Sequence, residues 1–470
     1  MLFHPQTVIK KDGTFTLSKQ TAAIAHPCMS ATIIKEFWNN LSFQTSTLTV
    51  NECNELVFCI GNASKPALQG YDYAINVTPD GICLCADTEK DLQRGFMTLV
   101  DLFYDVDAED DSLAIRIDCC EILDRPLIQN RMVHFCIFPE TEFFELQRFV
   151  RLCGALKYTH IVLEFWGMLQ YDCMKELGWC HAFSKEQVRP IIKEAHDMGL
   201  EVIPMFNHWG HASGCRGCYG KQTVLDQNPK LQTYFSADGW RWDIAKPKVR
   251  ALLRSIREEL CELCGEGKYF HVGCDEAYGF DFSKESMDFI CDFLNEISRE
   301  MNEKGRRIIA WGDMCLSKHP EFNPENRYVD CNNPSLESEQ YMLEHLDRSI
   351  VIADWQYTAP VAPVETAAIF QDAGFDTLLC PWDRGIAQTK AAIATTKEFE
   401  LMGFMHTTWH TLSGGMCFVT LTAMGGFENI DEAKRSIHFK LTTAALLRKI
   451  MPINGDCRKA GWCKAQIDNV

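Results

Sequence analysis

The chain has 470 residues, a length typical of two folded domains, and its 46% apolar and 23% charged composition is that of a globular protein. A formal net charge of −18 argues against nucleic acid as a partner, because phosphates need a basic surface. No apolar run approaches the about 20 residues of a membrane span, and polar residues come too early for a secretory segment.

The first 122 residues are predicted to form a small α+β domain. Thr78-Pro79-Asp80-Gly81 is a hairpin turn between two apolar runs. Thr88 opens a helix that Asp91 is placed to cap. The strands expected in this domain are Glu55–Gly61, Tyr73–Val77, Ile82–Ala86 and Leu113–Ile117.

Residues 123–470 alternate short apolar strands with amphipathic helices. Eight such units in succession predict an α/β fold, a closed (β/α)8 TIM barrel, in which functional residues lie where the strands end. A helix spanning Asp431–Ile450 is expected to complete it. The predicted strands are Met132–Ile137, His160–Phe165, Glu201–Phe206, Tyr269–Gly273, Arg307–Trp311, Ile350–Trp355, Thr377–Cys380 and Phe404–Thr408.

Two of the intervening helices carry clear signals. Ser184 and Gln187 form a capping-box pattern, and Gly199 marks the end of that helix. A later helix ends at Gly305. Its apolar residues share one face: Phe289, Phe293, Ile297 and Met301.

Indoles end six of the eight predicted strands: Trp166, Trp209, Trp311, Trp355, Trp382 and Trp409. Core packing would place Trp within strands or on helices, so repetition at one rim favours a binding site. Aromatic faces pack well against the C–H faces of a sugar, and we therefore predict carbohydrate binding. A bound cofactor or a hydrophobic lid is the alternative.

Asp275 and Glu276 follow the fourth barrel strand, and Gly273 before them permits close approach of the backbone. Two adjacent carboxyls near apolar walls cannot both ionise at low cost, so their pKa values should separate. One anion and one proton donor are what glycosidic cleavage requires. A solvated or salt-bridged acidic loop is the alternative interpretation. His271 is expected to buttress the pair or to be a buried, hydrogen-bonded side chain.

The segment His271-Val272-Gly273-Cys274-Asp275-Glu276 resembles the His-x-Gly-Gly-Asp-Glu signature of family 20 glycoside hydrolases, the β-N-acetylhexosaminidases. Cys in place of the second Gly looks most like the intracellular branch related to hexosaminidase D. Val202-Ile203-Pro204 through Gly210-His211 is similar to the family's Ile-Pro-Glu…Pro-Gly-His segment. The N-terminal domain is similar to the small domain that commonly precedes the family's barrel.

The resemblance implies a retaining exo-hydrolase that removes terminal β-linked GlcNAc or GalNAc from a small glycan, with no cofactor and no metal. The substrate's own acetamido oxygen would attack the anomeric carbon, Asp275 would orient the acetamido group, and Glu276 would be the acid and base. Taken together with the polar and aromatic residues at the strand ends, the resemblance leads us to predict these substrate-binding residues: Arg131, Glu164, Trp166, His208, His211, His271, Trp311, Trp355, Tyr357, Trp382, Asp383 and Trp409.

Several positions depart from the family pattern. Met205 and Asn207 replace the usual Glu and Asp, and Glu164 stands where many members have Asp. Pro381 occupies the position of the Tyr that normally binds the acetamido oxygen. Tyr357, on the preceding strand, is a candidate replacement for that hydroxyl.

The same sequence features also allow two other functions. A metal-dependent barrel would use Glu164, His211, His271 and Asp275 as ligands for Mg or Mn. A catalytically silent barrel would keep the Trp residues for glycan binding alone. Exposed apolar barrel helices also leave a homodimer open.

The 23 cysteines, an odd number without an export signal, favour reduced thiols and a cytoplasmic location. Cys215 and Cys218 have metal-like spacing in a loop, but no second pair completes a zinc site. Cys261 and Cys264 have similar spacing within a predicted helix, where core packing or a solvated face explains them.

Overall fold

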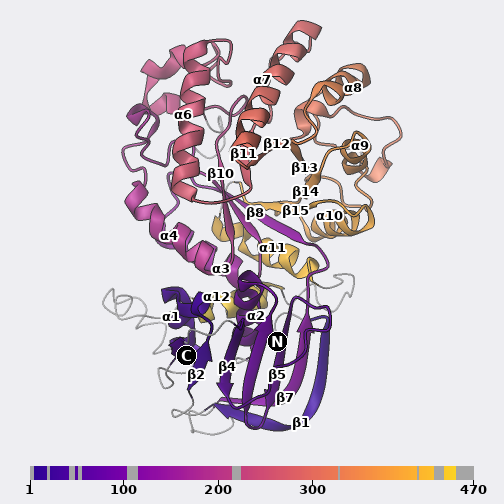
Figure 1. Cartoon of the computed structure of the whole chain (residues 1–470). Coiled ribbons are helices and arrows are strands. Elements are labelled where there is room, and N and C mark those ends of the chain that lie inside the picture. Colours follow the sequence, from indigo (N-terminus) through magenta and orange to yellow (C-terminus); the bar gives the residue numbers. More distant parts are fainter. Residues whose placement is uncertain are drawn as a thin grey trace.

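The computed structural model describes residues 5–17, 22–41, 48–50, 55–102, 115–213, 224–326, 329–409, 412–427 and 439–450. It consists of an antiparallel sheet domain, at the bottom of Figure 1, and a closed eight-stranded parallel barrel above it. The predicted TIM barrel preceded by an α+β domain is therefore confirmed. None of the helices in the described ranges has the length and apolar character needed to cross a membrane.

The N-terminal sheet has seven strands in the order β1-β7-β5-β6-β4-β2-β3. Alternate residues of the buried strands enter the core because successive side chains of a strand point to opposite faces. Helix α2 (Glu89–Leu102) packs on β5 and β6, and the predicted cap is present, with the Asp91 N–H donating to Thr88 Oγ1 at 3.1 Å. The strands are β1 Thr7–Leu17, β2 Ala23–Ala25, β3 Leu48–Val50, β4 Val57–Gly61, β5 Tyr73–Thr78, β6 Gly81–Ala86 and β7 Ile115–Asp124, and the other helix is α1 Thr32–Leu41.

The barrel closes in the order β8 to β15, with β15 pairing back to β8. Its strands are β8 Asn130–Cys136, β9 His160–Glu164, β10 Glu201–Met205, β11 Tyr269–Gly273, β12 Arg307–Trp311, β13 Val351–Trp355, β14 Thr377–Cys380 and β15 Gly403–Thr407. The helices are α3 Phe143–Ala155, α4 Lys185–Asp197, α5 Val224–Gln227, α6 Pro247–Cys264, α7 Lys284–Glu303, α8 Leu336–His345, α9 Thr366–Asp372, α10 Ile386–Glu398, α11 Leu412–Gly425 and α12 Phe439–Ile450.

The predicted barrel strands match these bounds to within one or two residues at each end, the usual uncertainty of a strand terminus. The predicted capping box is present at the start of α4: the Gln187 N–H donates to Ser184 Oγ, and the Ser184 N–H donates to Gln187 Oε1. On the predicted apolar face of α7, Phe293, Ile297 and Met301 are buried, whereas Phe289 is 38% exposed and lines a pocket. The strand β1 was not predicted, and residues 113–114 and 431–438 of predicted elements lie outside the described ranges.

Buried charges hold the sheet domain against the amino end of the barrel. Lys157, in the loop before β9, donates from Nζ to Asp124 Oδ2 at 3.1 Å and to Tyr73 Oη at 3.1 Å. Lys157 and Asp124 are both buried, so each supplies the partner that makes the other's burial tolerable. This contact leaves the carboxyl end of the barrel facing away from the sheet domain.

Candidate active site

The loop after β11 holds its acidic pair in a constrained backbone. Glu276 has φ of +45° and Cys274 has φ of +76°, a region that non-glycine residues rarely adopt. A Cβ at Gly210 would lie 1.8 Å from the Asp275 carbonyl oxygen, and one at Gly273 would lie 1.5 Å from Asn207 Oδ1. The predicted close approach at Gly273 is confirmed, and Gly210 is needed for the same reason.

The two carboxyls of the pair have different surroundings. Asp275 is 3% exposed, and its Oδ1 is buried with no hydrogen-bond partner among the described residues. Glu276 is half-buried, and its Oε2 lies 2.9 Å from His211 Nε2. The same His211 nitrogen is 3.6 Å from Asp275 Oδ2. His211 therefore bridges the two acids.

The pKa values of the pair separate, as expected from their adjacency. Burial raises the pKa of Asp275 well above its ordinary value. Burial alone would raise the pKa of Glu276 as well, but the hydrogen bond and charge of His211 and a hydrogen bond from Tyr278 lower it overall. These opposite shifts favour protonation of Asp275 over protonation of Glu276, the reverse of the roles that the family resemblance implies.

A third carboxyl, Asp313, ties the pair to the neighbouring strands. The Glu276 N–H donates to Asp313 Oδ2 at 2.9 Å, and Trp355 Nε1 donates to Asp313 Oδ1 at 3.1 Å. Asn332 Nδ2 donates to Asp313 Oδ2 at 2.7 Å. Burial raises the pKa of Asp313 even with these donors. The position of Glu276 thus depends on β12 and β13 as well as on its own strand.

Aromatic rings surround the mouth of the barrel. The Trp311 and Trp409 ring centroids lie 5.4 Å apart, and Trp355 and Tyr357 lie 5.1 Å apart. The Tyr357 ring also packs edge-on against Trp382 at 5.1 Å, and Trp409 Nε1 donates to Tyr357 Oη at 2.5 Å. These rings come from the ends of β12 and β13 and from the segments that follow β13, β14 and β15, so closure of the barrel gathers them at one end.

Residues 163–381, which include the acidic pair and two of these indoles, Trp311 and Trp355, match the model of glycosyl hydrolase family 20, catalytic domain. The barrel is a family 20 glycosyl hydrolase domain.

Individual relatives of the family 20 barrel are distant. The chain is 22% identical over 185 residues to lacto-N-biosidase of Bifidobacterium bifidum, covering 36% of this chain and 16% of that protein. It is 27% identical over 128 residues to hexosaminidase D of Bos taurus, covering 27% of this chain and 35% of that protein. The matched segments span about a sixth to about a third of these relatives' lengths.

The fold itself extends over nearly the whole chain. The crystal structure of the family 20 exo-β-N-acetylglucosaminidase of Vibrio harveyi, in complex with N-acetylglucosamine, superposes with a TM-score of 0.66 at 16% identity. The superposition covers 96% of this chain and 77% of that one. Both the sheet domain and the family 20 barrel are thus shared at the level of fold.

Glu164 lies in a buried polar cluster of the family 20 barrel. Its Oε1 accepts from Asn207 Nδ2 at 2.7 Å, and its Oε2 lies 3.0 Å from His134 Nε2 and accepts from Cys136 Sγ at 2.9 Å. These ligand-type atoms of His134, Cys136 and Glu164 lie within 4.8 Å of one another. Sequence reasoning did not single out His134 or Cys136, although both lie on a predicted strand.

The metal ligand set proposed from the sequence is not assembled. Among the described residues, Glu164 groups with His134 and Cys136, whereas His211 pairs with the acidic residues. His271 instead accepts the Gly273 N–H at Nδ1 and packs on the Trp311 ring, with centroids 4.4 Å apart. Cys215 and Cys218 lie outside the described ranges. Cys261 and Cys264 lie on α6, and Cys264 is buried, in agreement with core packing.

Two residues that were predicted to contact the substrate have side chains directed away from the barrel mouth. Arg131 lies at the amino end of β8, and its guanidinium donates to the carbonyls of Lys157, Ile128 and Gln129. Both ring nitrogens of the buried His208 are used away from the rim, one beside the Phe206 carbonyl and one accepting from Arg257. Burial lowers the pKa of His208 well below its ordinary value, so it stays neutral.

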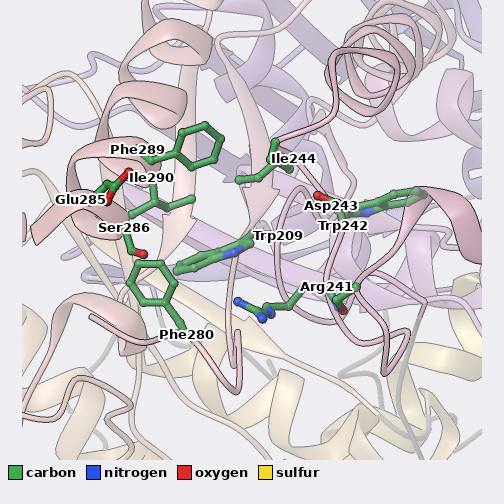
Figure 2. A pocket seen from close by; sticks show the side chains of 12 residues that line it. Trp209, Arg241, Trp242, Asp243, Ile244, Phe280, Glu285, Ser286, Phe289 and Ile290 are labelled. Carbon is green, nitrogen blue, oxygen red and sulfur yellow. The ribbon is translucent and has the colours of Figure 1, made fainter. Parts of the chain in front are cut away.

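Five of the six predicted rim indoles lie at the barrel mouth. Trp166 packs on Phe138, with ring centroids 5.2 Å apart, in a buried group against which Trp409 also packs. Asp383, in the loop after β14, is half-buried, and burial raises its pKa. Trp209 is the exception: its ring packs edge-on against Phe280 at 4.7 Å and lines a separate pocket of about 520 Å³ (Figure 2).

Three contacts of the acidic pair were not predicted as site residues. Trp240 Nε1 donates to the Glu276 carbonyl at 2.5 Å, and its ring lies 4.5 Å from that of His211. Tyr278 stacks on Trp240 at 5.7 Å and is 50% exposed. Asp313 is one of the polar residues that follow the predicted strands, so the strand-end pattern located it without assigning it to the site. Trp240 lies in an irregular loop with no such signal.

Proposed function

We propose that this chain is a retaining exo-β-N-acetylhexosaminidase that removes terminal β-linked GlcNAc or GalNAc from small glycans by substrate-assisted catalysis. The observation that carries the proposal is the Asp275–Glu276 pair, bridged by His211 beneath an aromatic rim in a family 20 barrel. The names of the Bos taurus hexosaminidase D and the Vibrio harveyi exo-β-N-acetylglucosaminidase support the same substrate class.

The acetamido oxygen of the substrate attacks the anomeric carbon in this mechanism, so the enzyme needs no nucleophile of its own. The usual spacing rule for two catalytic carboxyls does not apply to such substrate-assisted enzymes. Glu276 protonates the leaving oxygen and then takes a proton from the attacking water. Asp275 accepts the acetamido N–H and stabilises the positive charge that develops on the ring formed.

Substrate binding must redistribute the one proton that the pair holds. Before binding, burial keeps it on Asp275, and His211 stabilises the Glu276 anion. An acetamido N–H that donates to Asp275 favours the ionised form of that carboxyl, since hydrogen bonds to a charged form lower a pKa. The proton is then available to Glu276, where it is needed. The pair titrates as a unit, and the substrate decides which member is the acid.

Tyr357 is suited to hold the acetamido oxygen in place of the missing Tyr at position 381. Its Oη accepts a hydrogen bond from Trp409 Nε1 at 2.5 Å and lies 3.2 Å from Thr407 Oγ1, which also contacts the Pro381 carbonyl at 3.1 Å. When the single Thr407 proton goes to Pro381, the Tyr357 hydroxyl is a donor, and we propose that the acetamido oxygen accepts from it. Burial raises the pKa of Tyr357 well above its ordinary value, which keeps that proton in place.

We also propose a cytoplasmic location. All cysteines in the described ranges are free thiols, and most are buried. Such thiols persist in a reducing compartment. Fractionation of cells expressing the full chain with a small C-terminal tag tests this: recovery of the activity in a secreted or membrane fraction would contradict it.

The test of the activity is hydrolysis of aryl β-N-acetylglucosaminide and aryl β-N-acetylgalactosaminide by wild type, Asp275→Asn and Glu276→Gln. We expect turnover by wild type and strong losses in both variants, with retained configuration in the first product seen by NMR. A wild type that binds N-acetylglucosamine without hydrolysing either glycoside would instead indicate the silent glycan-binding barrel. Glycosyl azide formed by Asp275→Asn in the presence of azide would indicate a covalent enzyme nucleophile and exclude the acetamido route.

A further inference from the structure

Two cysteines of the N-terminal sheet face each other across neighbouring strands, far from the barrel mouth. Cys59 on β4 and Cys83 on β6 are directly opposite in the antiparallel pairing. Their Sγ atoms lie 2.7 Å apart. Because directly opposite residues point to the same face of a sheet, the two thiols share the face turned away from the apolar core formed by Phe58, Ile60 and Leu84.

The ladder shows which kind of antiparallel pair the two cysteines form. The Asn62 N–H donates to the Asp80 carbonyl, and the Ala86 N–H donates to the Leu56 carbonyl. Hydrogen-bonded pairs recur at every second position, so the cysteines occupy a non-hydrogen-bonded pair, in which Cα atoms are about 4.5 Å apart. That separation falls within the range of about 4.4–6.8 Å that disulfides span.

The two thiols differ in access. Cys59 is half-buried and can be reached by a small reagent, whereas Cys83 is 1% exposed. The nearby Cys85 is also buried, and its Sγ donates to the Pro66 carbonyl at 3.3 Å, away from the pair. The arrangement therefore offers one reachable sulfur and one protected partner in contact with it.

We propose that Cys59 and Cys83 are a reversible thiol–disulfide pair that a small-molecule disulfide, such as glutathione disulfide, oxidises. The Cys59 thiolate attacks one sulfur of the small disulfide, forms a mixed disulfide and releases one small thiol. The Cys83 sulfur then attacks Cys59 Sγ, closes the cross-strand bond and releases the second small thiol. The protein thiols lose two electrons and two protons, and the small disulfide gains both.

The electrostatics agree with this order of attack. The hydrogen bond from Cys83 lowers the pKa of the Cys59 thiol in spite of its partial burial. The same contact and burial raise the pKa of Cys83, which keeps that thiol protonated until Cys59 has reacted. Thiolate character and access therefore coincide on Cys59, as they do in redox-sensitive cysteines.

Closure of the bond would join β6, inside the sheet, to the edge group of β4, β2 and β3. Helix α1, next to this edge, carries Glu36, which forms an ion pair at 3.2 Å with Arg151 of barrel helix α3. The bond thus tethers one of the parts of the sheet domain that contact the barrel. Local opening of this edge should become rarer after oxidation, because the link removes conformations from the opened state.

The experiment uses the native full chain equilibrated in glutathione buffers from fully reduced to fully oxidised. Samples are quenched in acid, remaining thiols are alkylated, and peptides are mapped without reduction. We expect a Cys59–Cys83 linked peptide whose yield rises with oxidation, together with joint loss of alkylation at both positions. Hydrogen exchange of β2 to β4 amides should slow in the oxidised sample and recover after addition of dithiothreitol.

Two variants test the assignment of Cys59 as the attacking thiol and Cys83 as its disulfide partner. Cys85→Ser should leave the linked peptide unchanged, and Cys83→Ser should trap glutathione on Cys59. A native chain that accumulates glutathione on Cys59 while Cys83 stays alkylatable would overturn the proposal. So would a Cys59–Cys85 link, or a pair that stays reduced while the exposed Cys173 and Cys180 react. The native-chain mapping does not depend on any variant folding.

Discussion

At the amino end of the barrel Arg131 and Lys157 are as deeply buried as Asp275 is at the carboxyl end, but the surroundings differ. The Arg131 guanidinium donates to three backbone carbonyls, and Lys157 bonds Asp124, Tyr73 and Thr98. At the carboxyl end the buried polar atoms without a partner in the described residues include Asp275 Oδ1, His271 Nε2 and Trp311 Nε1.

Backbone strain is also concentrated at the carboxyl end, although Lys157 at the amino end has φ of +58°. Of the nine described non-glycine residues with positive φ, five lie at the barrel mouth: Trp166, His211, Cys274, Glu276 and Trp409. Unsatisfied polar atoms and strained backbone each cost stability, of the order of 1–3 kcal/mol. The difference shows that the amino end stabilises the contact between domains, whereas the carboxyl end keeps polar groups for a ligand. Substitutions at the two ends should therefore separate activity from stability.

The largest effect is expected for Glu276→Gln. Loss of the acid and base should lower kcat/KM by about 10²–10⁴-fold on a glycoside with a poor leaving group. Thermal unfolding should change little, because the amide keeps the size and can still contact His211. Full activity on the poor leaving group, measured against wild type at the same fraction folded, would show that Glu276 is not the acid.

At the opposite end Lys157→Met should act on stability alone. It leaves the Asp124 carboxylate buried without its charged partner, which costs about 3–5 kcal/mol. Urea unfolding should show this loss, while kcat/KM per folded molecule stays at the wild-type value. The matched variant Lys157→Met with Asp124→Asn should recover part of the stability. A drop in kcat/KM of the folded fraction would mean that the two ends are coupled.

Asp275→Asn should raise stability at neutral pH while it removes activity. Burial raises the folded-state pKa of Asp275, so the protonated carboxyl contributes to the free energy of unfolding. That contribution is full below the unfolded-state pKa of about 3.9 and is lost as pH rises through the folded-state pKa. Asn removes this ionisation. The gain over wild type should therefore be absent in acid and appear as pH rises, at a size below the loss in Lys157→Met. A variant less stable than wild type at neutral pH would show that the Asp275 anion has a partner.

The smallest expected effect is a displaced limb of the pH profile. The pair is active with one proton, so kcat/KM should fall above the raised pKa of Asp275 and below the lowered pKa of Glu276. His211→Gln removes the hydrogen bond and charge that lower the Glu276 pKa. The acid limb of the kcat/KM profile of this variant should move to higher pH, while its alkaline limb should move less. An unmoved acid limb would mean that His211 does not control Glu276.

Local sequence signals were enough to predict most of the fold. The capping residues Ser184 and Gln187, the end of β11 at Gly273 and the repeated strand–helix pattern depend on nearest neighbours along the chain. The acidic pair could be located for the same reason, since parallel strands of a barrel end at one rim. The pattern located the strand ends but not the direction in which each neighbouring side chain points.

Tertiary structure decided which rim residues meet. His208 and His211 are three positions apart, yet one bonds Arg257 behind the strand and the other bridges Asp275 and Glu276. Trp209 likewise turns to an outer pocket, and Trp240 reaches Glu276 from a loop with no periodic pattern. The sequence by itself therefore determined the barrel and the acidic pair. Only the folded chain decided which acid holds the proton, because burial and the contact with His211 arise from residues distant in sequence.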